Sequence, residues 1–196
     1  MFRWLALATL LACGVISGTF RARARRESGT IARRNEPPWL LAGRGVVALP
    51  LLLAIVLHLV NPPWMARASW PASPALRWLG VALGFVAVPA AWWVFRSIGR
   101  NVSETVLVKE RHELVTCGPY RWIRHPLYAT GLLALAGIGL MLASWVILLL
   151  TLIALLAIRL VVIPLEEKAL TARFGEAYRD YACRTGRLVP RVRERA

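Results

Sequence analysis

Two short polar clusters carry the side chains best suited to chemistry. The first lies between residues 112 and 128, where histidine, tyrosine and arginine side chains surround the turn Gly118-Pro119. The second is the acidic pair Glu166-Glu167, which directly follows an apolar stretch. Adjacent acids beside hydrocarbon are costly unless they are solvated or partnered. The pair therefore either ends a helix in water or faces a hydroxyl, ammonium or sulfonium group of a ligand.

A helix is expected to begin at Pro126, because proline is favoured at the first helical position. Free N–H groups and a partial positive charge at a helix N-terminus can hold a carboxylate or a phosphate, and Arg121 and Arg124 add to this attraction. The simpler interpretation treats Arg124, His125, Trp122 and Tyr128 as anchors at the membrane interface. The residues alone leave both interpretations open.

One arginine, Arg159, falls inside an apolar segment, about two helical turns before Glu166. It either snorkels to the membrane interface or binds an anionic substrate group such as a carboxylate. A metal site built from His112, His125 and the acidic pair is not expected, because no spacing of the HExxH kind is present.

These clusters lie at the ends of apolar segments that approach the length of a bilayer span. The chain has 196 residues, of which 58% are hydrophobic, whereas soluble domains contain about 45–50%. A span needs about 20 apolar residues. Five segments approach this length: residues 4–20, 46–60, 76–95, 126–142 and 145–163. We therefore predict an all-α, polytopic membrane protein with five transmembrane helices, the last two forming a hairpin.

The chain divides into two portions of different character. Residues 1–95 are expected to form three N-terminal transmembrane helices with their connecting loops. Residues 96–196 hold both polar clusters, the helical hairpin and a polar tail, and are interpreted as the catalytic portion.

The distribution of positive charge predicts the orientation in the membrane. The net charge is +15, and nearly all lysines and arginines fall in three segments between or after the predicted spans. These segments are residues 21–44, 96–124 and 168–195. The positive-inside rule places them in the cytoplasm, with the N-terminus outside and the C-terminus inside. Because the basic residues alternate with apolar blocks, nucleic-acid binding is not expected.

The polar tail is predicted to contain a cytoplasmic amphipathic helix. Its apolar and aromatic side chains recur at intervals of four, four and three residues, at Leu170, Phe174, Tyr178 and Tyr181. Basic residues lie off this stripe. Such a helix either lies on the membrane surface or covers a site.

Several separated motifs follow one another in the second half of the chain. They are His112-Glu113-Leu114-Val115-Thr116-x-Gly118-Pro119-Tyr120, Arg124-His125-Pro126-x-Tyr128, Glu166-Glu167, Phe174-Gly175-x-x-Tyr178-x-x-Tyr181 and Thr185-Gly186-Arg187-Leu188-x-Pro190. Together they cover roughly residues 98–190 and resemble the isoprenylcysteine carboxyl methyltransferase family and the related membrane phospholipid methyltransferases. The short five-span layout is similar to that of the prokaryotic members.

The resemblance implies a methyltransferase that binds S-adenosylmethionine at the cytosolic face. By this likeness the cofactor would contact His112, Glu113, Leu114, Val115, Tyr120, His125, Pro126, Leu127, Tyr128 and Glu166. The helix start at Pro126 suits the cofactor's carboxylate, and Glu166 suits a hydroxyl or amine group. Aromatic rings, such as those of Tyr120 and Tyr128, attract a sulfonium cation.

Two residues are expected to act on the methyl acceptor, a lipophilic compound or lipid that enters from the bilayer. Arg159 would position an acceptor carboxylate, since Val162 stands where the family has an arginine four residues before its conserved glutamate. Glu167, or else His125, would take the proton from an amine acceptor such as a phosphatidylethanolamine headgroup. The rival hypotheses are a non-catalytic basic membrane protein that binds lipid or a partner, and a sterol-reductase-like oxidoreductase. A monomer is expected.

Overall fold

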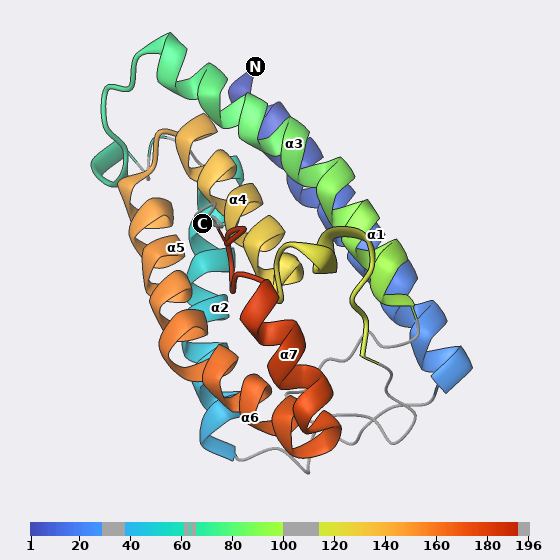
Figure 1. Ribbon diagram of the computed structural model, residues 1–196. Helices are drawn as coiled ribbons and strands as arrows, with labels where there is room; N and C mark the ends of the chain where they lie inside the picture. Colours follow the sequence, from blue (N-terminus) through green and yellow to red (C-terminus); the bar gives the residue numbers. More distant parts are fainter. Residues whose placement is uncertain (29–37, 61–62, 64–65, 100–113, 192–196) are drawn as a thin grey trace.

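The computed structural model describes residues 1–28, 38–60, 63, 66–99 and 114–191. Within these ranges the long elements are all helices, as predicted, and two isolated bridges are the only β pairing. The helices are α1 (Phe2–Ser28), α2 (Pro38–Val60), α3 (Pro74–Ile98), α4 (Pro126–Met141), α5 (Trp145–Ala157), α6 (Ile163–Phe174) and α7 (Glu176–Arg184). Figure 1 shows α1 to α6 as one bundle, with α7 beside the start of α4.

Four stretches of the described chain are long and apolar enough to cross a membrane. They are Phe2–Glu27, Pro38–Val60, Pro74–Ile98 and Trp145–Phe174. α4 is also apolar but has only 16 residues. At 1.5 Å per residue it is about 24 Å long, which is less than the roughly 30 Å of a bilayer's hydrocarbon core. The prediction of a multi-pass helical membrane protein is therefore confirmed, whereas only four of its five spans reach the required length.

Small residues let α3 and α4 pack with their backbones in contact. A Cβ atom at Gly80 would lie 2.7 Å from the carbonyl oxygen of Gly137 and 2.7 Å from the backbone nitrogen of Met141. Gly84 follows four residues later on the same face of α3, a spacing typical of close helix packing in membranes. α1 lies along α3 (Figure 1), so these helices together fix the position of α4.

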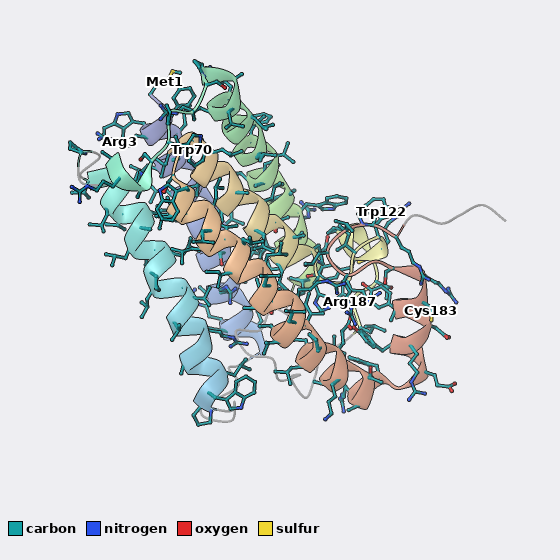
Figure 2. The ribbon with its side chains drawn as sticks, turned by 90° about the vertical axis from the view of Figure 1, so that its left-hand side faces the viewer. Met1, Arg3, Trp70, Trp122, Cys183 and Arg187 are labelled. Carbon is teal, nitrogen blue, oxygen red and sulfur yellow. The ribbon has the colours of Figure 1, made fainter. Side chains whose placement is uncertain are left out.

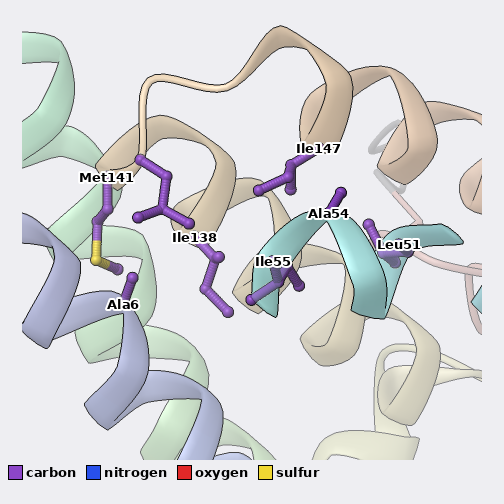
Figure 3. Close-up of a cluster of buried hydrophobic side chains, with 8 residues drawn as sticks. Ala6, Leu51, Ala54, Ile55, Ile138, Met141 and Ile147 are labelled. Carbon is purple, nitrogen blue, oxygen red and sulfur yellow. The ribbon is translucent and has the colours of Figure 1, made fainter. Parts of the chain in front are cut away.

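The predicted hairpin of α4 and α5 is present. Ala143 adopts a left-handed φ of 51° in the connecting turn, and the Ser144 hydroxyl accepts a hydrogen bond from the backbone N–H of Ile147, capping α5. A buried apolar cluster joins this turn to α1 and α2 (Figure 3). Its members are Ala6, Leu51, Ala54, Ile55, Ile138, Met141, Leu142 and Ile147. The hairpin is thus anchored at its closed end, while its open end carries Pro126 and the acidic pair.

The last long helix continues past the predicted end of the fifth span. A π-helical turn, Ile158–Val162, joins α5 to α6 without a break. Gly175, with a φ of 56°, then ends α6 and starts α7. An amphipathic C-terminal helix is present as α7, but the predicted stripe from Leu170 to Tyr181 is divided between α6 and α7, because glycine at this left-handed φ separates two helices. The bend brings α7 back toward the segment that precedes α4 (Figure 1).

Candidate functional site

The two polar clusters meet at one end of the helical bundle, which we call the site end. Figure 2 shows Trp122 and Arg187 at this end and Met1, Arg3 and Trp70 at the opposite end. The site end is built from the segment of residues 114–125, the start of α4, the acidic pair on α6, and α7 with the residues that follow it. These parts are far apart in the sequence, and tertiary contacts alone bring them together.

The segment before α4 begins with the predicted turn at Gly118. Gly118 has a φ of 58°, and a Cβ atom there would collide with the Ser97 hydroxyl. Only glycine meets both requirements. The turn buries Tyr120, whose backbone carbonyl accepts a hydrogen bond of 2.7 Å from the Tyr181 hydroxyl of α7. The turn thereby connects the end of α3 to α7.

The chain after α7 pairs with the segment before α4 in a short parallel bridge between Ile123 and Gly186. The Gly186 N–H donates to the Trp122 carbonyl at 3.0 Å, and the Arg124 N–H donates to the Gly186 carbonyl at 2.8 Å. The His125 N–H then donates to the Arg187 carbonyl at 3.0 Å. The backbone of His125 is therefore fixed by the C-terminal tail at the point where α4 begins.

Glu166 lies at the centre of a polar cluster that we call the Glu166 cluster, together with the buried His125 and the half-buried Tyr128. The Tyr128 hydroxyl donates a hydrogen bond to Glu166 Oε1. Nδ1 of His125 lies 3.3 Å from Glu166 Oε2, and the His125 and Tyr128 rings stack with centroids 6.0 Å apart. Three residues that the sequence predicted for the cofactor are thus in mutual contact.

The electrostatic environment favours a protonated His125. Burial by itself would lower the pKa of the imidazole, but the carboxylates of Glu166 and Glu167 outweigh it and raise that pKa above its ordinary value. His125 is 6% exposed, so these charges act with little screening by water.

Two buried donors of the site have no hydrogen-bond partner among the described residues. One is Nε2 of His125, which lies 3.6 Å from Glu167 Oε1, too far for a hydrogen bond. The other is the hydroxyl of Tyr178, which is 3% exposed. Burial raises the pKa of Tyr178, and the nearby Glu167 charge raises it further, so the phenol stays neutral. Unpaired buried donors are costly, and both therefore suit polar atoms of a ligand.

Glu167, expected as a base, is held by two arginines. Nε of Arg124 lies 2.9 Å from Oε1, and Nη2 of Arg187 lies 2.8 Å from Oε2. Arg124 also donates to the backbone carbonyls of Ala182, at 2.7 Å, and of Thr185. Charge-assisted pairs on both oxygens stabilise the ionised carboxylate and make it a poor proton acceptor.

The other predicted cofactor residues have more varied surroundings. Pro126 is buried at the first position of α4, and Leu127 packs into an apolar cluster with Ala24 and Phe95. Leu114 and Val115 are half-buried before the Gly118 turn. His112 and Glu113 lie outside the described residues.

Arg159 lies in the π-helical turn, and its side chain is exposed rather than directed into the Glu166 cluster. Val162, which stands at the position of the family's arginine, packs with Leu40 of α2 against Tyr128. The charges of Arg21 and Arg44, from α1 and α2, act on the Tyr128 phenol. Positive charge therefore reaches the cluster from several helices.

Sequence reasoning missed the contributions of Tyr178 and Arg187. Tyr178 was recognised as part of an apolar stripe and of a family motif, and Arg187 only as part of a family motif, and neither was given a role in the site. A tyrosine on a short amphipathic helix and an arginine in a tail have no local feature that distinguishes a site residue. Their role depends on the bend at Gly175, which brings both against Glu167.

Fold and site together define an integral, multi-pass membrane protein with a charged, partly unpaired polar cluster at one end of its helices. The chain belongs to the phospholipid methyltransferase (PEMT) family, which it matches over residues 75–177. That stretch includes the Glu166 cluster and both glutamates of the acidic pair.

The chain is also similar to individual bacterial proteins. The chain is 26% identical over 172 residues to the uncharacterized protein YpbQ of Bacillus subtilis, covering 85% of this chain and 95% of YpbQ. It is 32% identical over 121 residues to the cobalt-zinc-cadmium resistance protein CzcN of Cupriavidus metallidurans, covering 61% of this chain and about half (51%) of CzcN.

Among solved structures, the fold is similar to that of the eukaryotic intramembrane Ras methyltransferase ICMT, isoprenylcysteine carboxyl methyltransferase. The TM-score is 0.56 at 20% sequence identity, and the match covers 94% of this chain and 62% of that one. At this identity the likeness concerns the fold. The family and the fold together identify a membrane methyltransferase, in agreement with the resemblance noted in the sequence.

Proposed function

We propose that the protein transfers a methyl group from S-adenosylmethionine to an ionised oxygen of a lipophilic acceptor, with an isoprenylcysteine-like carboxylate as the preferred class. The observation that carries this proposal is the Glu166 cluster together with two unpaired buried donors, His125 Nε2 and the Tyr178 hydroxyl, in a chain of the phospholipid methyltransferase family.

The residues at the site end fit such a cofactor. Nε2 of His125 and the Tyr178 hydroxyl, together with the start of α4, would hold its carboxylate. Glu166 would accept from its ammonium or ribose hydroxyl groups, and the Tyr120 and Tyr128 rings would face its cation. When bound, the cofactor supplies a methyl group on a positively charged sulfur that a nucleophile can displace. We retain His112, Glu113, Leu114 and Val115 as proposed contacts from the family resemblance.

The protein's own contribution would be alignment and exclusion of water. A direct displacement requires the acceptor oxygen, the methyl carbon and the leaving sulfur in line, and good alignment alone contributes about 7–11 kcal/mol. His125 is buried, and the Glu166 cluster is fixed by the hydrogen bond between Tyr128 and Glu166 and by the backbone bond of His125 to the tail, which supports this role.

The state of the candidate bases supports an acceptor that is already ionised. Within the described part of the chain, Glu167 is paired with two arginines, Glu166 accepts from Tyr128, and His125 favours its protonated form. An amine acceptor would have to lose a proton to one of these groups, whereas a carboxylate would not. The phospholipid N-methyltransferase alternative is therefore less well supported.

The experiment is labelled methyl transfer by the full chain in lipid nanodiscs. The acceptors are an S-prenylated N-acetylcysteine and phosphatidylethanolamine, and binding of S-adenosylhomocysteine is measured by calorimetry. We expect binding of the cofactor product and a base-labile methyl ester on the prenylated acid. Absence of S-adenosylhomocysteine binding would contradict the methyltransferase assignment. Label found only in phosphatidylethanolamine would show that the acceptor group is an amine and not a carboxylate.

Arg159 is proposed to attract the acceptor's carboxylate, since it is an exposed charge in an apolar helical stretch about two turns before Glu166. Arg159→Ala is expected to raise the KM for the acid acceptor about tenfold, the size typical of one lost charge-assisted contact. Binding of S-adenosylhomocysteine should not change. Lys168→Ala, which removes an exposed charge further along α6, is the matched control. A KM equal to the parent's would remove Arg159 from the mechanism.

The site end is proposed to face the cytoplasm, because the basic segments flank it. Cys117 and Cys183 are exposed at this end. In intact cells a membrane-impermeant thiol reagent should leave both unlabelled and should label them after lysis. Labelling of Cys183 in intact cells would show that the site end faces the outside of the cell and not the cytoplasm.

A further inference from the structure

Glu167 connects three parts of the chain that are distant in sequence: α6, the segment before α4, and the C-terminal tail. Resting on the proposed function, we propose that Glu167 is a positioning residue. With Arg124 and Arg187 it holds His125 in place to receive the cofactor's carboxylate. In this assignment Glu167 neither accepts a proton nor touches the acceptor, and the tail forms a wall of the cofactor site.

The first observation is the number of restraints that converge on Arg124, the residue directly before His125. Its guanidinium reaches Glu167 at 2.9 Å and the Ala182 carbonyl at 2.7 Å, and it also reaches the Thr185 carbonyl. Its backbone N–H is bound by Gly186. Only 10% of the Arg124 side chain is exposed. A residue held in this way fixes the backbone from which the His125 ring projects.

The second observation is that Arg187 is attached twice to the same place. Its backbone carbonyl accepts from the His125 N–H at 3.0 Å, and its guanidinium contacts Glu167 at 2.8 Å. The side chain is 39% exposed, so the ion pair alone contributes modestly. Its importance comes from the coupling, because the residue whose guanidinium pairs with Glu167 also accepts the His125 N–H at its backbone carbonyl.

The charges of the network explain why an anion would bind there. Glu166 and Glu167 of α6 face His125. The Tyr128 ring of α4 stacks on the imidazole. Arg124 and Arg187 do not contact the imidazole but pair with Glu167. Two adjacent carboxylates alone would repel an anion. The two arginines and a protonated imidazole reverse that balance to one net positive charge, which suits a carboxylate beside Nε2 of His125.

The test uses the full chain in nanodiscs, with S-adenosylhomocysteine affinity measured by calorimetry across pH. Arg187→Ala is expected to weaken binding about tenfold, and Arg187→Lys to recover most of the loss by restoring the charge. Arg179→Ala, which removes an exposed arginine of α7, is the matched control and should bind as the parent does.

Glu167→Gln separates positioning from a merely structural role. Affinity should fall as rising pH deprotonates His125. Removing the Glu167 charge lowers the raised pKa of His125, so the fall in affinity should begin at a lower pH than in the parent. A general loss of structure would weaken binding equally at all pH values.

Gly186→Ala tests the tail without changing a charge. A Cβ atom there would collide with the Val189 carbonyl, so the bridge to Ile123 should open and affinity should fall about tenfold or more. Gly131→Ala on α4 is the control, because its Cβ atom would meet open space.

The outcomes separate the two proposals. If the parent does not bind S-adenosylhomocysteine, the proposed function fails. If the parent binds it, but Arg187→Ala and Gly186→Ala bind equally well and Glu167→Gln keeps the parental pH profile, the positioning role is refuted while the proposed function stands.

Discussion

Replacing Glu166 by glutamine is expected to lower the rate of methyl transfer by about a hundredfold or more. The carboxylate accepts a hydrogen bond from Tyr128 and pairs with Nδ1 of His125. The oxygen of a glutamine amide can accept a hydrogen bond from one of these donors. Its NH₂ group would then face the other donor, which would have no acceptor. An unsatisfied buried donor and a lost charge-assisted bond together cost about 3 kcal/mol, equivalent to roughly a hundredfold.

The measurement is the initial rate of labelled methyl transfer, with S-adenosylhomocysteine affinity as the second readout. Both should fall in Glu166→Gln, because the cluster is proposed to bind the cofactor. The control is Glu176→Gln, which removes an exposed acid at the start of α7. Parental activity in Glu166→Gln would show that the chemistry lies elsewhere in the chain.

The two glutamates illustrate how far the sequence could define the site. Adjacent side chains on a helix point about 100° apart, so Glu166 bonds to Tyr128 while Glu167 pairs with the arginines, although both lie near His125. The sequence showed that the pair was unusual, but it could not assign these directions. That assignment depends on the tail, whose position follows from the bend at Gly175 and the bridge at Gly186.

The fold was more predictable than the roles of the site residues. Long apolar segments form helices in a membrane because they satisfy every backbone group internally, so α1 to α5 could be located from hydropathy. Two features had weak or no local pattern. The π-helical turn Ile158–Val162 continues an apolar helix without a change of composition. The left-handed φ of Ala143 in the turn after α4 is adopted by a residue other than glycine, so no turn residue marks it in the sequence.

Gly80→Ala is expected to produce the largest loss of stability among single methyl additions between the helices. The new Cβ atom would lie 2.7 Å from the Gly137 carbonyl oxygen and 2.7 Å from the Met141 nitrogen. Both are backbone atoms of α4, so they cannot move aside as a flexible side chain could. Overpacking of this kind costs about 2–3 kcal/mol, equivalent to a fall in Tm of roughly 5–10 °C for a chain of this size.

The stability change should extend to function, because α4 carries His125 and Tyr128 at its other end. Separating α3 from α4 displaces the helix start that completes the Glu166 cluster, so S-adenosylhomocysteine affinity should decrease together with Tm. Gly14→Ala on α1 is the control, since its Cβ atom would meet no neighbour within 4 Å and alanine favours the helix. Thermal unfolding of the detergent-purified variants by intrinsic fluorescence measures the difference. Equal Tm values for the two variants would mean that α3 and α4 do not pack backbone to backbone in the membrane protein.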